Sequence, residues 1–131
     1  MFLRLVTSLL AIAGPAQAQD QITPGSFLDA AVGHTLTFTG YASNRVVGVE
    51  EFLRRDRTVW VTTDGRCTYG TVDIRGPYQC FTYEDEPFKD HFWLTFRHGD
   101  RFAVMASNTH ELQIVTQISK EPLACEDVPL S

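Results

Sequence analysis

The sequence predicts an all-β protein, an eight-stranded antiparallel up-and-down barrel or a strongly curled meander, with one short helix before the strands. After Gly33, apolar and polar residues alternate with a period of two through most segments, as in strands that bury one face. Short turns rich in Gly, Asp and Asn separate these segments, and such turns join antiparallel neighbours. Closing the meander into a barrel removes its exposed edges. A barrel of this size is filled by its own side chains or holds one small ligand, and the sequence leaves both open.

Length and composition describe one globular domain. The chain has 131 residues, of which 44% are hydrophobic and 21% charged, and its formal net charge is -5. A nucleic-acid binder needs a positive surface that displaces counterions from phosphates. We therefore expect no nucleic-acid partner.

The first residues have the pattern of a secretory signal peptide, predicted over residues 1–18. Arg4 precedes an apolar run over residues 5–13, and the small-residue pattern Ala16, Gln17, Ala18 follows Pro15. Removal of this segment would leave 113 residues with a net charge of -6, starting at Gln19. The short Ala-rich segment predicts a bacterial protein that is periplasmic or secreted.

We expect no membrane span. The apolar run before Pro15 is about half the ~20 residues that a spanning helix needs. A membrane-spanning barrel needs strands of ~9 to 11 residues, longer than those predicted here, and an apolar outer band. The outward positions of this chain carry Thr, His and Arg instead.

One helix precedes the strands, predicted over residues 26–32. Ser26 can cap it, Asp29 completes a capping box, and Gly33 ends it, with an apolar stripe of Phe27, Leu28, Ala31 and Val32. The barrel domain is predicted over residues 19–119, followed by a tail over residues 120–131 that a disulfide fixes to the body. The predicted strands cover residues 34–41, 47–54, 57–63, 67–74, 77–84, 91–98, 101–107 and 112–118.

Alternation assigns the inner face of several strands. One set of apolar residues consists of Leu36 and Phe38, and another of Phe102, Val104 and Ala106. We predict two further inner sets, which are Phe92, Leu94 and Phe96 in the sixth strand and Leu112, Ile114 and Ile118 in the eighth.

Three cysteines, Cys67, Cys80 and Cys125, allow one disulfide and one free thiol in an oxidising compartment. We favour Cys67 with Cys125, because that bridge would fix the Pro-containing tail. Cys67 with Cys80, which would link neighbouring strands, stays as the alternative. Cys80 lies in an aromatic strand, where a free cysteine acts as a small buried hydrophobic residue.

Four segments carry a resemblance to known proteins. They are Gly48-Val49-Glu50, Arg57-Thr58-Val59-Trp60, residues 64–70 (DGRCTYG) and residues 80–84 (CFTYE). Over residues 33–125 the chain resembles small uncharacterised secreted proteins of alphaproteobacteria and, more loosely, lipocalin-like domains of unknown function. Those relatives often carry a further Cys before the Trp of the sixth strand, where this chain has Phe92 before Trp93. The resemblance implies the fold, the compartment and an unpaired Cys80, and it implies no activity.

Candidate chemistry is sparse. Glu50 and Glu51 are adjacent in a strand and point to opposite faces, so they cannot act as a paired acid and base, and we expect both to be solvated. An acidic turn of Glu84, Asp85, Glu86 and Asp90 and a basic cluster of Arg54, Arg55 and Arg57 are expected to be charged turns. The histidines His34, His91, His98 and His110 and the cysteines lack metal-ligand spacing, so no metal or other cofactor is expected.

The leading hypothesis is a non-enzymatic, monomeric small β-barrel protein that binds a small apolar or amphipathic ligand. It predicts a cavity lined by Leu36, Phe38, Phe96, Val104 and Ile114. The alternative is an inhibitor or interaction module that binds an envelope protein through its outer surface, with a filled interior and an exposed aromatic or acidic loop. Aromatic residues able to line a pocket or a partner surface are Tyr41, Trp60, Tyr69, Tyr78, Tyr83 and Trp93. An enzyme and a structural envelope protein are further classes that the sequence leaves open.

Overall fold

A computed structural model describes residues 20–125. The predicted signal peptide and the last six residues of the predicted tail lie outside this range. The elements are β1 (Asp20–Ile22), α1 (Pro24–Ala31), β2 (Thr35–Gly40), β3 (Val46–Arg54), β4 (Arg57–Thr62), β5 (Cys67–Arg75), β6 (Tyr78–Tyr83), β7 (Asp90–His98), β8 (Arg101–Ala106) and β9 (Leu112–Ser119). Within this range no helix is long and apolar enough to cross a membrane.

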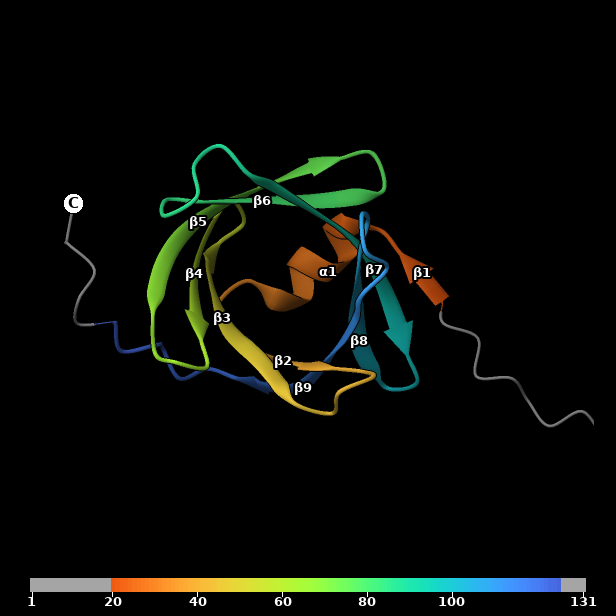
Figure 1. The fold of residues 1–131 in the computed structure, drawn as a ribbon. Helices are drawn as coiled ribbons and strands as arrows, with labels where there is room; N and C mark the ends of the chain where they lie inside the picture. The colour runs from red at the N-terminus through yellow and green to blue at the C-terminus, as the bar shows by residue number, and fades with distance from the viewer. Residues whose placement is uncertain (1–19, 126–131) are drawn as a thin grey trace, which may run out of the picture.

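Strands β2 to β9 form a closed antiparallel barrel (Figure 1). Each strand pairs with its neighbours in sequence, and β9 returns to pair with β2 between Thr35 and Gly40. The predicted eight-stranded up-and-down barrel is confirmed in its closed form. Each predicted strand boundary lies within one residue of the observed one, because turn residues and alternation agree along this part of the chain.

An additional strand precedes the helix. Asp20, Gln21 and Ile22 of β1 pair with Arg97, Phe96 and Thr95 of β7, on the β7 edge that β6 occupies further along the strand. The sequence pattern does not predict β1, because three residues are too few to show alternation.

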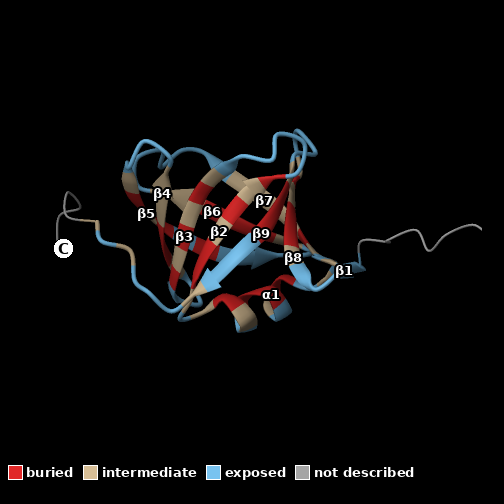
Figure 2. Cartoon of the chain, turned by 90° about the horizontal axis from the view of Figure 1, so that it is seen from below, coloured by how far each residue is buried: buried red, intermediate tan, exposed pale blue. Residues whose placement is uncertain are grey.

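Helix α1 closes one end of the barrel (Figure 2). It begins two residues earlier than predicted: the Thr23 side chain, not that of Ser26, caps it by accepting a hydrogen bond from the Ser26 backbone N–H at 3.1 Å. Pro24 occupies the first turn, where its missing N–H costs nothing. The buried Phe27 ring packs edge-on against Phe52 and Phe102, so the helix fills this end of the barrel.

The inner face differs from the predicted one in two strands. In β7 the inward residues are His91, Trp93 and Thr95, which places Phe92, Leu94 and Phe96 on the outer face. In β9 the inward residues are Gln113 and Val115, which places Ile114 outside. Phe96, Ala103 and Ile114 are register partners and form an apolar row on the outer face. Since both faces of these strands carry large apolar residues, alternation alone could not select the inner one.

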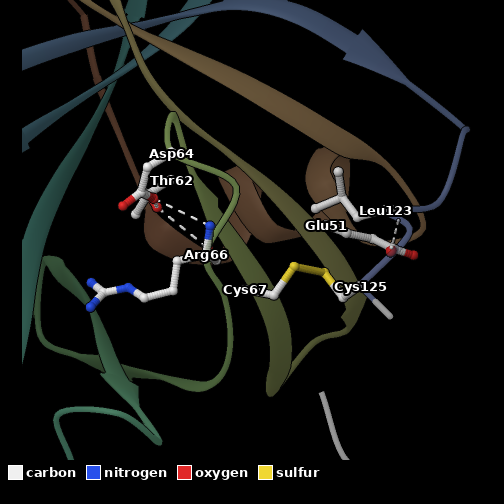
Figure 3. Close-up of a disulfide and its surroundings, with 7 residues drawn as sticks. All are labelled: Glu51, Thr62, Asp64, Arg66, Cys67, Leu123 and Cys125. Carbon is white, nitrogen blue, oxygen red and sulfur yellow. Dashed lines mark hydrogen bonds between the residues drawn. A yellow bond between two sulfur atoms is a disulfide. The ribbon is translucent and has the colours of Figure 1, made fainter. Parts of the chain in front are cut away.

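The C-terminal tail crosses the outside of the barrel and is held at three points, of which Figure 3 shows the Leu123–Glu51 contact and the disulfide. Thr35 Oγ1 donates to Glu121 O at 2.7 Å, and the Leu123 N–H donates to Glu51 Oε1 at 2.9 Å. A disulfide then joins Cys125 to Cys67 at the start of β5. This bridge confirms the favoured pairing, and it excludes the pairing of Cys67 with Cys80, which is a buried free thiol.

Candidate ligand-binding cavity

The barrel encloses a cavity of about 210 Å³ near the end opposite α1. Its rim includes Val47, Tyr83, His91 and Glu111, which lie at or beside the strand ends away from the helix. The helix-side half of the barrel is filled by buried side chains, Phe27 and Phe52 among them. The interior is therefore hollow at one end and packed at the other.

Five residues of the cavity wall are Phe, Tyr or Trp: Phe38, Trp60, Phe81, Tyr83 and Trp93. Both tryptophans of the chain are in this set. Tyr83 stacks on Phe81 with ring centroids 6.2 Å apart, and Phe38 lies 6.2 Å from Trp60. Such walls offer large, rigid apolar surfaces to a ligand.

Two inward-facing glycines make room for these rings. A Cβ atom on Gly48 would lie 2.4 Å from the Trp60 ring, and one on Gly70 would lie 2.8 Å from the Tyr83 ring. Neither distance is sterically possible, so any side chain at these positions would displace a ring of the wall. The two glycines in β3 and β5 therefore determine where Trp60 and Tyr83 sit.

The residues predicted to line a pocket divide into three groups. Phe38 and Val104 line the cavity. Leu36 is buried in the core but is not part of the cavity wall. Phe96 and Ile114 lie on the outer face, as the register of β7, β8 and β9 requires.

Glu50 is the residue that departs most from the sequence-based expectation. Its neighbour Glu51 is on the outer face, as alternation requires, but Glu50 is only 4% exposed and lines the cavity. The Tyr83 hydroxyl donates to the Glu50 carboxylate, at 3.0 Å from both oxygens. The expectation that Glu50 is solvated is therefore wrong, because closure of the barrel turns this face of β3 inward.

Burial controls the ionisation of this pair. It raises the pKa of Glu50 to about 8, although the hydroxyls of Thr58 and Tyr83 favour the carboxylate and oppose the shift. Of these two hydroxyls, that of Tyr83 is hydrogen-bonded to Glu50, whereas Thr58 Oγ1 lies near the carboxylate without hydrogen-bond geometry. Burial, and then the nearby Glu50 charge, raise the pKa of Tyr83 well above its ordinary range. Tyr83 therefore stays protonated and remains a donor.

Gln79, on β6, supplies a second polar group of the wall. It is 1% exposed, it lines the cavity, and its Oε1 atom has no hydrogen-bond partner. A buried amide oxygen without a partner is uncommon in folded proteins, because the desolvation of that atom is uncompensated. An N–H or O–H group inside the cavity would satisfy it.

Other charged groups at the rim are paired. His91 Nε2 lies 3.7 Å from Glu86 Oε2, and its ring packs edge-on against Tyr83. Glu111 is exposed and accepts a hydrogen bond from the Gln113 side chain at 3.2 Å.

The basic cluster and the acidic turn are satisfied by ion pairs. Arg54 contacts Asp56, Arg55 contacts Asp29, and Arg57 contacts Glu84 at 2.8 Å. In the acidic turn, Asp85, Glu86 and Asp90 are likewise within 4 Å of a Lys, Arg or His nitrogen. These contacts fit the expected charged turns rather than an ion site.

Neither the histidines nor the free cysteine form a second site. Over residues 20–125 no group of three or more His, Cys, Asp or Glu side chains is placed to hold a metal ion. Burial raises the pKa of the Cys80 thiol, which disfavours the reactive thiolate.

Sequence reasoning missed Glu50, Gln79 and His91 as cavity residues. The signal that could have found Glu50 is its parity with Gly48 and Phe52 in one strand, which places all three on the same face. A carboxylate flanked at that spacing by glycine and phenylalanine is more consistent with an inner than an outer position.

Comparison of the chain with models of known protein families, with curated proteins and with solved structures found no match. The function is therefore argued from the residues of this cavity.

Proposed function

We propose that the protein is a non-enzymatic binding protein that holds one small amphipathic molecule in the barrel cavity. The observation that carries the proposal is Gln79, a residue of the cavity wall whose buried Oε1 atom has no hydrogen-bond partner. Natural proteins rarely leave such an atom unsatisfied, and a bound molecule with a donor group would remove the cost.

The size of the cavity sets the size of the ligand. A cavity of about 150 Å³ accommodates one benzene molecule. The cavity of about 210 Å³ therefore suits a single ring with a short polar side chain. The aromatic walls favour the apolar part of such a molecule, and Glu50, Tyr83 and Gln79 favour its polar part.

The composition of the wall supports binding rather than covalent chemistry. The residues that line the cavity include no Ser, Thr, Cys or Lys side chain, and two of its other possible nucleophiles, Glu50 and Tyr83, are hydrogen-bonded to each other. Glu50 has a raised pKa, a property that catalytic acids share, but the second carboxylate of the wall, Glu111, is an exposed rim residue.

The disulfide supports an oxidising compartment, periplasmic or extracellular, as the place of action. A bridge of this kind persists outside the reducing cytosol and holds the tail on the barrel.

The experiment is native mass spectrometry, paired with denaturing mass spectrometry, on the full chain expressed in a bacterium and purified from the periplasm. The denatured mass should correspond to a chain starting at Gln19 and lie two hydrogens below the reduced value. The native mass should exceed the denatured mass by one discrete small molecule.

Two results would contradict the proposal. A denatured mass that retains residues 1–18 would contradict export. Equal native and denatured masses, unchanged after incubation with single-ring compounds, would contradict binding in the barrel.

A second candidate function is supported by one loop. Phe88 is fully exposed, with 101% relative exposure, between acidic residues of the β6–β7 connection. An inhibitor or interaction module was expected to present such a loop, but also to have a filled interior, which the cavity contradicts. Inhibition of a basic lysozyme by the wild-type chain that is lost in Phe88→Ala would favour this candidate over the first.

A further inference from the structure

We infer that the cavity selects an organic cation, a single aromatic or aliphatic ring that carries a protonated amine held by Glu50 and Gln79. The inference rests on the proposed binding function and names the class of ligand.

The charge of the cavity wall is the first argument. Its charged residues are Glu50 and Glu111, its other titratable groups are Tyr83 and His91, and the wall residues include neither Lys nor Arg. A carboxylate or phosphate ligand would meet Glu50 with no fixed positive charge to compensate it. A cation would neutralise a carboxylate that is otherwise costly to ionise in a buried position.

The hydrogen-bonding capacity is the second argument. Glu50 accepts one O–H from Tyr83, and an ionised carboxylate has further lone pairs to offer. Gln79 Oε1 accepts none. Ionised Glu50 and Gln79 Oε1 therefore offer free acceptor sites on the wall, and a primary ammonium group, with three N–H donors and no acceptor, complements them.

The placement of the tryptophans is the third argument. Glu50 is the register partner of Trp60, and Gln79 is the register partner of Trp93. Partners in adjacent strands share a face, so each buried acceptor has an indole ring beside it. Indole is the preferred side chain for cation–π contact, so acceptor and ring would act on the same ammonium group.

Binding of such a cation is coupled to proton release. The free Glu50 carboxyl is largely protonated at neutral pH, whereas the bound cation favours its ionised form. The other titratable groups near it are Tyr83 on β6, His91 on β7, Glu111 before β9, and Asp85, which acts on Tyr83. Tyr83 stays neutral, so Glu50 is the expected source of the proton.

The test is isothermal titration calorimetry of the full mature chain with 2-phenylethylamine, with its neutral analogue 2-phenylethanol, and with the anion 3-phenylpropanoate. We expect the amine to bind about tenfold or more tightly than the alcohol at pH 8, as charged hydrogen bonds allow. Amine affinity should rise with pH below about 8, by up to about tenfold per pH unit. Binding should also release a proton, which is detected as a binding heat that changes with the ionisation enthalpy of the buffer.

Variants assign the effect to the named residues. Glu50→Gln should lose the preference for the amine, the pH dependence and the proton release, while it still binds the alcohol. Gln79→Met should weaken binding of both probes, because both offer a donor to Oε1. Glu51→Gln is the matched control: the adjacent carboxyl faces outward, and its Gln replacement can still accept the Leu123 N–H, so amine binding should be unchanged.

The outcomes separate the two proposals. Equal affinity for the amine and the alcohol, with no effect of Glu50→Gln, would overturn the cation inference and leave the binding function intact. Tightest binding of 3-phenylpropanoate would overturn it in favour of an anion. Absence of binding by all three probes, together with a native mass that shows no bound molecule, would overturn both.

Discussion

Glu50 and Gln79 are buried in positions that cost folding free energy. An apolar residue at either site would avoid the desolvation of a polar group. Both residues lie on the cavity wall, and a few polar groups in a mostly apolar cavity give a binding site its orientation and selectivity. At the scale of residues, the selectivity of the cavity therefore depends on a few polar side chains with apolar neighbours.

The raised pKa of Glu50 predicts a pH dependence of stability. Between its ordinary pKa of 4.5 and about 8 the native state holds the Glu50 proton and the unfolded state does not. The free energy of unfolding should therefore fall as pH rises through this window, by up to roughly 4 kcal/mol at about 1.4 kcal/mol per pKa unit. Urea denaturation at pH 5, 6, 7 and 8 measures it.

The Glu50→Gln variant isolates this contribution. Its free energy of unfolding should vary less with pH than that of the wild type, and the difference between the two chains should shift in favour of the variant as pH rises. Glu51→Gln, on the outer face, should retain the wild-type dependence. Parallel pH profiles for wild type and Glu50→Gln would contradict the burial of this carboxyl.

Gly48 is predicted to be intolerant of alanine. The added methyl group would meet the Trp60 ring at 2.4 Å and the Val61 carbonyl oxygen at 2.8 Å. Overpacking of this kind costs about 1–3 kcal/mol. In the Trp60→Phe background the smaller ring relieves the first contact, so Gly48→Ala should cost less there in thermal unfolding. An equal cost in both backgrounds would show that Trp60 does not pack on Gly48.

At the scale of elements, the positions of the strands could be predicted from the sequence. Which face of each strand points into the barrel could be predicted only in part. Boundaries followed from turn residues such as Gly65, Gly76 and Gly99, whose positive φ values favour glycine. Faces followed in β2 and β8, where one side is plainly apolar. In β7, the three apolar residues Phe92, Leu94 and Phe96 alternate with only one large apolar residue, Trp93, so the pattern predicts that they face inward. The register with β6 and β8 places them on the outer face.

The start of the helix and the contacts of the tail were predicted only in part from the sequence. Thr23 and Ser26 both match the residue types of a helix cap, and Pro24 decides between them because it starts a helix but cannot continue one. The tail was predicted to be tied by Cys125, but its contacts with Thr35 and Glu51 depend on strands distant in sequence.

The disulfide is predicted to hold the tail on the barrel and to stabilise the barrel. It closes a sequence separation of 58 residues, for which loop entropy alone gives about 4 kcal/mol. Cys125→Ser should lower the free energy of unfolding by about 2–4 kcal/mol and expose Val59, an outward-facing residue of β4 that is now 4% exposed. Denaturation with and without a reductant measures the loss of stability. Hydrogen exchange in β4 measures the exposure around Val59.

Cys80→Ala serves as the control for this variant. It removes a thiol that takes part in no disulfide, so the stability of Cys80→Ala should still depend on the reductant. If wild type and Cys125→Ser were equally stable under oxidising conditions, the bridge would not support the fold.

At the scale of the whole molecule, the barrel is divided along its axis. Helix α1 covers one end (Figure 2), which is packed with side chains and stabilises the fold, and the other end holds the cavity and the polar residues. The sequence predicted the barrel but left open whether it is filled or hollow. That property depends on how large rings and inward glycines from different strands combine, which no single segment shows.

The most direct test is to map a bound molecule by NMR, using the indole N–H signals of the two tryptophans, Trp60 and Trp93, which both line the cavity. The ¹⁵N-labelled chain would be titrated with 2-phenylethylamine, 2-phenylethanol and 3-phenylpropanoate. The account predicts that at least one probe shifts both indole signals in a saturable way and shifts the Gln79 amide with them. Saturable shifts confined to outer-face residues such as Phe88 and Phe96, with both indole signals unmoved, would contradict it.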